Sequence, residues 1–234
     1  MVKYQNVAKK IKQMIYQQQL SKGTQLANID GLINQYQVSR STIIKALNCL
    51  ERQGVIYQVQ GSGIFVRERK KRGYLSFLQS HGFTVDLDDV YGSSKVFNVD
   101  IIKPSARVKE NLQCDDSEHV YFVKRLRYVD DKLYCLEQSY YRKKLICYLN
   151  TDIVERSIFS YIQENYNINI GFSDKYFQVI KLDANIAKYL GLQAGDPALC
   201  VEEIFYTSSG EPFDFSKIIY HYENARFCIQ NHSK

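Results

Sequence analysis

Apolar residues in the first part of the chain recur three and four positions apart, which is the spacing of one helix face. This pattern predicts a helix over Tyr4–Leu20, with lysines lying off the apolar stripe. A second helix is predicted from Asn28, a candidate N-cap, to Tyr36. A third is predicted from the candidate cap Ser39 to Gly54, because glycine often follows the last residue of a helix.

Two β-rich runs follow these helices. Val55–Val59 and Ile64–Val66 flank the segment 60–63, whose small residues predict a hairpin with a flexible tip. Three helices followed by a hairpin form the plan of a winged helix-turn-helix module, which places its recognition helix in the major groove of DNA. The pattern therefore predicts a DNA-binding head.

The chain beyond Arg72 changes to alternating and β-rich runs with few helical segments. The predicted strands are Val96–Ile102, His119–Tyr128, Lys132–Tyr141, Phe177–Leu182, Ala198–Tyr206 and Pro212–Tyr222. The predicted helices are Ile153–Glu164 and Ala184–Leu190. Hairpin signals around Asp130-Asp131 and Ser208–Gly210, without regular βαβ alternation, predict an antiparallel α+β domain.

Charge divides the 234-residue chain in the same place. Residues 1–72 hold 13 Lys and Arg and three acidic residues, a net charge of +10. The remainder holds 18 basic and 22 acidic residues, a net charge of −4. A basic head on an acidic body is typical of nucleic-acid-binding proteins. Charge alone leaves a basic face without a partner equally open.

Several classes of function are excluded by what the sequence lacks. No apolar run reaches the roughly 18 residues of a membrane span, and the N-terminus has no apolar signal core, so we expect a cytoplasmic protein without a membrane partner. The six cysteines are scattered, which fits neither a metal site nor a disulfide framework. The sequence has no P-loop, nucleophile-elbow or zincin motif. We therefore expect no enzyme activity, no cofactor and no metal.

The residues expected at the DNA lie at the start of the third helix and at the tip of the hairpin. Arginine recognises guanine through two hydrogen bonds, serine and threonine bond bases or phosphates, and glycine allows close backbone approach. The expected DNA-binding residues are Ser39, Arg40, Ser41, Thr42, Lys45, Gly61, Ser62 and Gly63.

Paired arginines stand out in the C-terminal part. Arg125 and Arg127 are two positions apart in a predicted strand, so their side chains share a face. Two adjacent guanidinium groups favour an anionic ligand. The neighbouring strand also offers Glu137, and from these residues alone a structural ion pair is favoured over a ligand site.

The last predicted hairpin places Asp214, Ser216 and Tyr220 on one face. A carboxylate, a hydroxyl and a phenol suit a polyol such as a sugar. A solvent-facing side of an edge strand is a serious alternative.

Residues 38–66 resemble the DNA-binding domain of the GntR family of bacterial transcriptional regulators. The matching positions are Val38, Ser39, Arg40, Thr42, Ala46, Leu47, Leu50, Gly54, Gly61, Gly63, Phe65 and Val66. One departure is Asp30, which stands where the family usually has an arginine that contacts DNA. The resemblance therefore implies operator binding with an altered contact at the second helix.

Residues from about 95 to 229 resemble the UTRA effector-binding domain of the HutC subfamily. The resemblance is carried by segments 125–137, 157–162, 189–199 and 210–227. It implies a fold like that of chorismate lyase, used as a sensor, and a homodimer formed largely through this domain. The phosphate-binding residues that it implies are Arg125, Arg127 and Ser157, with a loop formed by Tyr74, Leu75 and Ser76. The residues that it places at a sugar ring are Glu137, Asp214 and Tyr220.

Together these observations predict a winged helix-turn-helix domain over residues 1–68, a basic linker over 69–75 and a UTRA domain over 76–234. The predicted function is a transcriptional regulator that binds a palindromic DNA operator as a homodimer. We expect it to act as a repressor. A small effector, a sugar phosphate, is expected to release it. The alternatives are a ligand-independent DNA-binding protein and a lyase-like enzyme that uses the C-terminal fold.

Overall fold

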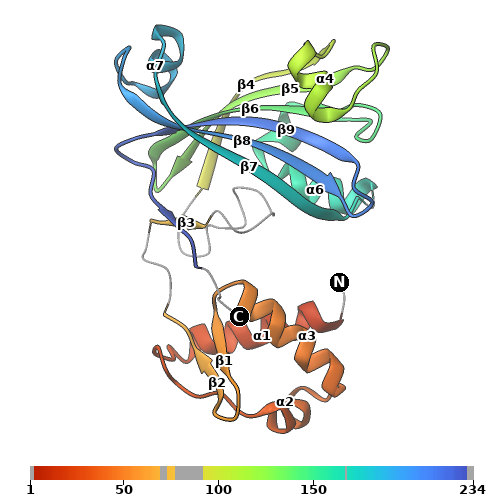
Figure 1. Ribbon diagram of the computed structural model, residues 1–234, viewed down its shortest axis with the longest axis vertical. Helices are drawn as coiled ribbons and strands as arrows, with labels where there is room; N and C mark the ends of the chain where they lie inside the picture. Colours follow the sequence, from red (N-terminus) through yellow and green to blue (C-terminus); the bar gives the residue numbers. More distant parts are fainter. Residues whose placement is uncertain (1–2, 69–72, 77–91, 167, 231–234) are drawn as a thin grey trace. The chain divides into compact units, whose positions relative to one another are not determined.

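The computed structural model describes residues 3–68, 73–76, 92–166 and 168–230. The chain forms two compact units, one made of Met1–Lys71 with Cys228–Lys234 and the other of Arg72–Phe227 (Figure 1). Most of the expected linker, residues 69–72, lies outside the described residues. The expected boundaries differ from this division at the C-terminus, where Gln230 donates a hydrogen bond to the Glu68 carbonyl at 3.1 Å.

The first unit contains every element that the apolar pattern predicts. Its helices are α1 (Lys3–Gln17), α2 (Ile29–Tyr36) and α3 (Arg40–Arg52), and its hairpin pairs β1 (Ile56–Val59) with β2 (Gly63–Val66). The apolar faces of the helices meet the hairpin in one core. The fully buried side chains of this core are Ile11, Leu32, Ile43, Ala46, Leu47, Leu50 and Ile56.

Helix ends in this unit follow the capping residues. The Asn28 side chain accepts a hydrogen bond from the Gly31 amide at 2.8 Å, and the Ser39 hydroxyl accepts one from the Thr42 amide at 3.4 Å. Each bond satisfies one of the amides that a helix leaves without an internal partner. Gly54 follows α3 with a φ of +70°, a conformation that glycine adopts without steric cost.

The second unit is built on a six-stranded antiparallel sheet with the order β4-β5-β6-β9-β8-β7 (Figure 1). Its strands are β4 (Gly92–Ile102), β5 (Val120–Val129), β6 (Lys132–Arg142), β7 (Ile170–Lys181), β8 (Pro197–Thr207) and β9 (Pro212–His221). Its helices are α4 (Ala106–Leu112), α5 (Thr151–Glu155), α6 (Ile158–Tyr166) and α7 (Ala184–Leu190). A two-stranded sheet pairs β3 (Leu75–Ser76) with β10 (Phe227–Cys228).

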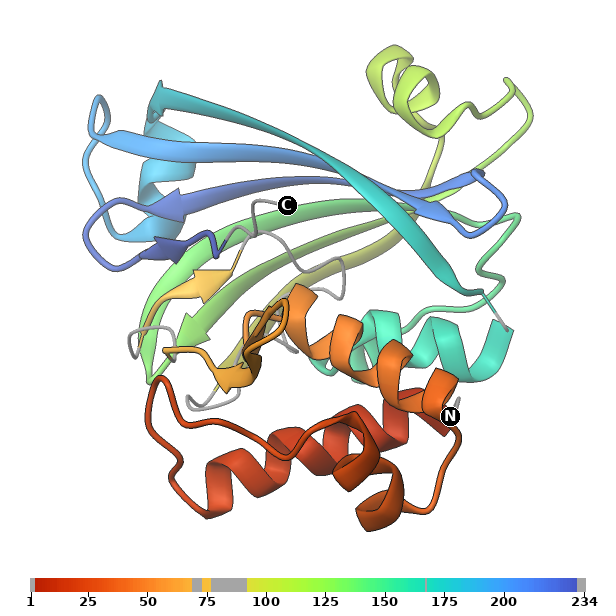
Figure 2. The same cartoon turned by 60° about the horizontal axis from the view of Figure 1, so that its bottom comes forward.

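The helices cover both faces of the sheet (Figure 2). Helices α5 and α6 pack on one face through a core that includes Val154, Ile162 and Phe213. Helix α7 packs on the opposite face, where Leu126 of β5 lies. Side chains of β5 therefore alternate between two cores, so that Arg125 and Arg127 share the face that α5 and α6 cover.

This unit differs from the sequence prediction in several elements, among them the start of β4, at Gly92 instead of Val96, and the unpredicted strands β3 and β10. The helix predicted over Ile153–Glu164 is two helices, because Arg156 between them has extended backbone angles of −96° and −158°. Strand β7 begins at Ile170, seven residues before the predicted start, because its polar and exposed first half lacks a clear apolar pattern. The structure also has α4, which the sequence prediction omitted.

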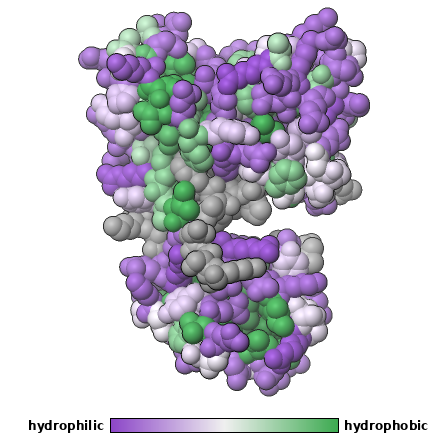
Figure 3. Space-filling model, in the orientation of Figure 1, coloured by the Kyte–Doolittle hydropathy of each residue, from purple (hydrophilic) through white to green (hydrophobic). Residues whose placement is uncertain are grey.

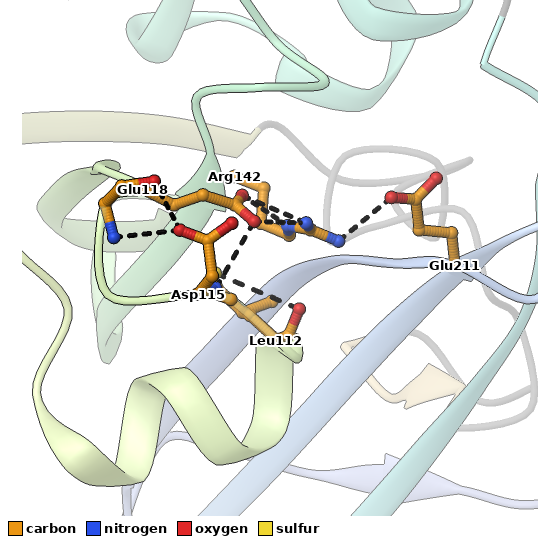
Figure 4. A network of polar contacts seen from close by, with 7 residues as sticks. Leu112, Asp115, Glu118, Arg142 and Glu211 are labelled. Carbon is orange, nitrogen blue, oxygen red and sulfur yellow. Dashed lines mark hydrogen bonds and ion pairs between the residues drawn. The ribbon is translucent and has the colours of Figure 1, made fainter.

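Arg142, at the end of β6, is the centre of a buried ionic cluster (Figure 4). Its Nε and Nη2 donate to the two carboxylate oxygens of Glu118 at 3.1 and 2.8 Å, and its Nη1 donates to Glu211 at 3.0 Å. Glu118 follows α4 in the chain, and Glu211 lies in the turn between β8 and β9. The cluster therefore ties three distant segments together.

None of the described helices has both the length and the apolar character required to cross a membrane.

Candidate functional site

The outward face of α3 collects exposed side chains at helical spacing. Ser39 and Thr42 are engaged with each other, because their hydroxyl oxygens lie 2.9 Å apart at the start of the helix. Within α3, the expected DNA-binding residues Arg40, Ser41 and Lys45 are exposed, and so is the cap Ser39. The same face adds exposed residues that the sequence analysis did not select, Ile44 and Asn48. The four-residue steps from Arg40 to Ile44 and Asn48 carry the signal that would have found them.

Arg40 has a partner on the preceding helix. Its Nη1 donates to the Asp30 carboxylate at 2.9 Å, and both side chains are largely exposed. Asp30 stands at the position where the GntR family, which this head resembles, usually has an arginine. The acid therefore contacts the first arginine of α3.

The hairpin tip is held close to the body of the first unit. The Gln25 side-chain amide donates to the Ser62 carbonyl at 2.9 Å. Gly61 and Gly63 have φ angles of +77° and +130°, and a Cβ at Gly63 would lie 2.5 Å from Gln25 Nε2. The glycine at position 63 is therefore required by the turn as well as by any approach to DNA.

A cavity opens in the second unit between the sheet and the first turn of α6. Four strands, β5, β6, β8 and β9, contribute side chains to it. Its lining residues are Arg125, Arg127, Glu137, Tyr141, Ser157, Ile158, Phe159, Glu203, Phe205, Asp214, Ser216 and Ile218. The structure thus brings together six residues that the sequence analysis selected, namely Arg125, Arg127, Glu137, Ser157, Asp214 and Ser216.

Arg125 forms a two-pronged contact with Glu137 on the neighbouring strand. The Nε and Nη2 atoms donate to the two carboxylate oxygens at 3.0 and 2.8 Å, and Nη1 donates to the Val154 carbonyl at 2.6 Å. Burial alone raises the pKa of Glu137, but Arg125 and Arg127 outweigh it and lower that pKa to about 2. Glu137 is therefore ionised, and the structural ion pair considered from sequence is formed by Arg125.

Arg127 lies beside this pair rather than in it. Its Nη1 donates to Ser94 Oγ at 2.8 Å, and its Nε is 3.7 Å from the nearer oxygen of Glu137. Burial and the neighbouring charge of Arg125 lower the pKa of Arg127 to about 10. At neutral pH both guanidinium groups are charged, and they share one ionised carboxylate.

The other two acids of the cavity do not add the same negative charge. Burial raises the pKa of Asp214 well above its usual value, and the nearby charge of Glu137 adds to this effect, while the Ser216 hydroxyl 2.8 Å away opposes it. Burial also raises the pKa of Glu203, whose carboxylate lies 2.9 Å from Lys175 Nζ. The raised pKa favours protonation of Asp214, and a protonated carboxyl group can donate a hydrogen bond.

Hydroxyl groups connect the acids of the cavity. Ser216 Oγ lies 2.8 Å from Asp214 Oδ1 and 2.7 Å from Ser139 Oγ, and Ser139 donates to Glu137 at 3.0 Å. Asp214 and Glu137 are therefore joined through two serines. A change in the protonation of one acid reaches the other through this chain.

The first turn of α6 closes the cavity on the opposite side. Ser157 Oγ accepts hydrogen bonds from the amide and the hydroxyl of Ser160, at 3.3 and 2.9 Å. Phe159 packs edge-to-face on Phe205 with ring centroids 4.5 Å apart. The N-terminal end of α6, which carries partial positive charge, thus lies at the same cavity as the two arginines.

The remaining expected effector residues lie outside the cavity lining. Tyr220 is on the same sheet face but packs against Tyr134 and Phe227, with ring centroids 5.9 and 4.7 Å away. Leu75 is buried in that same cluster, and it belongs to strand β3 rather than to a loop. Tyr74 is half-buried, and for Ser76 the structure describes only the backbone. Their roles at an effector stay predictions.

The sequence analysis missed the apolar lining residues and two titratable ones, Tyr141 and Glu203. Tyr141 and Glu203 lie on strands whose predicted bounds included them, and strand parity places them on the face of Glu137 and Asp214. Parity was thus a usable signal. Among the described residues, no group of three or more His, Cys, Asp or Glu side chains is arranged to hold a metal ion.

Comparison with known proteins covers both units. The model of bacterial regulatory proteins of the gntR family matches residues 3–66, and the UTRA domain model matches residues 92–226. The chain is 46% identical over 233 residues to the HTH-type transcriptional regulator YydK of Bacillus subtilis (strain 168), covering 100% of this chain and 99% of YydK. The crystal structure of YydK superposes with a TM-score of 0.86 at 45% identity, covering 99% of this chain and 100% of that one.

More distant relatives share the same architecture. The HTH-type transcriptional repressor NagR of Bacillus subtilis is 24% identical over 96% of this chain and 92% of its own length. The effector-binding domain of the Bacillus subtilis trehalose repressor TreR has the same fold, with a TM-score of 0.55 at 19% identity, covering 61% of this chain and 99% of that domain. The matched domains are those of a DNA-binding regulator with an effector-binding domain, not of an enzyme. This chain belongs to the GntR family of bacterial transcriptional regulators, in the HutC-type arrangement that joins a GntR head to a UTRA domain.

Proposed function

We propose that this regulator is a cytoplasmic repressor that binds a palindromic operator as a homodimer and leaves it when a sugar phosphate enters the cavity of the UTRA domain. The observation that carries the proposal is the charge balance of that cavity. Arg125 and Arg127 contribute two positive charges, and Glu137 contributes one negative charge. Glu203 is offset by Lys175, and the raised pKa of Asp214 favours its neutral form.

The described side chains thus give the cavity a net charge of about +1. Such a charge attracts an anion strongly in a buried site, because burial weakens the competing interaction with water. The start of α6 adds partial positive charge from its amides. A phosphate presents several acceptor oxygens, and arginine binds such groups with two parallel hydrogen bonds. The neutral Asp214 and the serine hydroxyls beside it suit the hydroxyl groups of a sugar.

The size of the cavity supports a coupling between binding and movement. Its volume is about 50 Å³, which accommodates only a few atoms. Pockets that bind small molecules usually enclose about 300–1,000 Å³. A sugar phosphate therefore requires the side chains around the arginines to move apart. An effector that binds the opened form shifts the equilibrium toward it, and this coupling is what operator release requires.

The names of two relatives support a carbohydrate or a carbohydrate derivative as the effector. One relative is the mannosyl-D-glycerate transport/metabolism system repressor MngR of Escherichia coli (strain K12), 25% identical over 97% of this chain. TreR is a trehalose repressor, and NagR is a transcriptional repressor. Repression linked to sugar metabolism therefore recurs among the relatives.

The homodimer is supported by the exposed edge of β7. Tyr176, Phe177 and Val179 lie within four residues of this one strand and are 60%, 49% and 75% exposed. Figure 3, drawn from the side on which β7 lies in front, shows a hydrophobic band on this unit. Edge strands with exposed apolar residues on both faces favour pairing with another chain. A twofold dimer would present two recognition helices to the halves of a palindrome.

The proposal is tested by operator release. Duplexes selected by the purified full chain from a random DNA pool supply a labelled operator, and fluorescence anisotropy measures binding with and without a panel of sugar phosphates and the matching free sugars. We expect a sugar phosphate to release the wild type and to have no effect on Arg127→Gln. The matched control is Arg156→Gln, which removes an exposed arginine beside the cavity and should keep the response.

Release by free sugars alone would show that the paired arginines serve the fold. Operator binding that no compound changes would favour the alternative of a ligand-independent DNA-binding protein.

A further inference from the structure

The exposed face of α3 carries two features that its role in operator binding does not by itself explain. The first is the contact between Arg40 and an acid on α2, Asp30, in a surface that must approach phosphates. The second is an exposed aliphatic side chain. Ile44 is 40% exposed, although the other aliphatic residues of α3, Ile43 and Leu47 among them, are completely buried.

We propose that Asp30 and Ile44 determine which sequence the head selects: Asp30 holds Arg40 in place for a guanine, and Ile44 contacts the methyl group of a thymine. This inference rests on operator binding by α3. It adds to that function the bases that the helix recognises.

The argument for Asp30 begins with its cost. A carboxylate near the DNA backbone is repelled by phosphates, so it weakens binding to every sequence alike. Paired with Arg40, it cancels one of the positive charges that would otherwise attract phosphates. It also restricts a long and exposed side chain to one orientation, which leaves further guanidinium donors for a base edge. Arginine recognises guanine through two hydrogen bonds to O6 and N7. Asp30 therefore lowers the affinity for DNA of any sequence and increases the discrimination between sequences.

The argument for Ile44 is geometric. It lies four residues after Arg40, on the same helix face, about 6 Å further along the axis. That distance corresponds to about two base steps of DNA. In the major groove, the thymine C5-methyl group is the apolar feature that distinguishes one base from the others. An exposed isoleucine there is matched to a methyl group rather than to a hydrogen-bonding edge. We therefore expect an operator half-site in which a guanine and a thymine lie about two positions apart.

The test of Ile44 uses uracil. Operator duplexes are selected from a random pool by the purified full chain, and each thymine of the selected half-site is then replaced by deoxyuridine, which lacks only the methyl group. We expect one replacement to weaken wild-type binding about fourfold, the factor for burying one methyl-sized group. Ile44→Ala should bind the thymine and uracil duplexes equally. Its exposed position keeps this variant folded. Equal binding of both duplexes by the wild type would overturn the role of Ile44.

The test of Asp30 uses salt and base substitution. Asp30→Asn frees Arg40 for phosphates, so the slope of log K against log salt should steepen by about one. Discrimination against replacement of the contacted guanine should fall at least about tenfold. The matched control is Glu68→Gln, which removes an acid from an equally exposed ion pair with Lys22 in the same unit and should leave discrimination unchanged.

The outcomes separate this inference from the function on which it rests. A wild type that selects no preferred sequence would contradict operator binding itself. A wild type with a clear operator, together with unchanged discrimination in Asp30→Asn and unchanged uracil sensitivity in Ile44→Ala, would overturn the inference and leave the operator function standing.

Discussion

Arg142 and the pair formed by Arg125 and Arg127 are buried in the same sheet, but their acidic partners differ in number. Arg142 contacts two carboxylates, those of Glu118 and Glu211 (Figure 4). Arg125 and Arg127 share the single ionised carboxylate of Glu137. Among the described residues, Arg142 has two acidic partners of its own, whereas Arg125 and Arg127 have one ionised carboxylate between them.

The difference teaches how to distinguish an arginine that serves the fold from one that serves a ligand. All three arginine side chains are buried, so the burial of the arginine does not separate the two clusters. Charge balance separates them. A buried charge without a counter-charge is costly in free energy, and a bound counter-ion lowers that cost. Substitutions in each cluster should therefore differ in their effects on stability and on ligand binding.

The largest loss of stability is expected from Arg142→Met. This change leaves the Glu118 carboxylate, only 9% exposed, without its two-pronged partner. Removing one member of a buried ion pair typically costs about 3–5 kcal/mol. Urea denaturation should show this loss in the transition of the UTRA domain. The double variant Arg142→Met with Glu118→Gln should recover part of it, and no recovery would argue against the charge as the cause.

A pH-dependent effect is expected from Asp214→Asn. The folded-state pKa of Asp214 is raised above the usual value of 3.8, so its contribution to stability is complete below that pH and is lost as pH rises through the folded pKa. Asparagine does not titrate. The free energy of unfolding of the variant, relative to that of the wild type, should therefore increase as pH rises above about 4. Parallel pH profiles for the two proteins would contradict the raised pKa.

A smaller effect is expected from Arg127→Gln without ligand. The change removes the hydrogen bond to Ser94 and the longer ion pair with Glu137, but it also removes the repulsion from Arg125. The net loss in unfolding free energy should be at most about 1 kcal/mol, the value of one hydrogen bond. A loss as large as that of Arg142→Met would show that the two clusters are equivalent and that both serve the fold.

The smallest change in stability is expected from Arg40→Ala. Its ion pair with Asp30 is largely exposed, and such pairs contribute less than about 1 kcal/mol. The same variant should lose specific operator binding. Thermal unfolding and electrophoretic mobility shift measure the two properties separately, and unchanged operator affinity would refute the role of Arg40.

Much of the fold followed from local pattern. Strand parity placed Arg125 and Arg127 on one face before any contact was visible, and capping residues located the starts of α2 and α3. These features depend on residues a few positions apart, which is the range over which sequence pattern is informative.

Other features depended on long-range packing. The sequence pattern does not predict the ionic cluster of Arg142, because its partners are 24 and 69 residues away. Tyr220 has the parity of the cavity residues, but neighbouring aromatic rings fix its place outside the lining. The contact of Asp30 with Arg40 depends on the angle between two helices, which no periodicity encodes.

The most direct test of the account is the melting temperature of the full chain with a saturating sugar phosphate, measured in the wild type and in Arg127→Gln. A ligand at one hundred times its dissociation constant stabilises the folded protein by about 2.7 kcal/mol. The account predicts a clear rise in melting temperature for the wild type and none for Arg127→Gln. An equal rise in both proteins would contradict it, because the anion would then bind without the second arginine of the cavity.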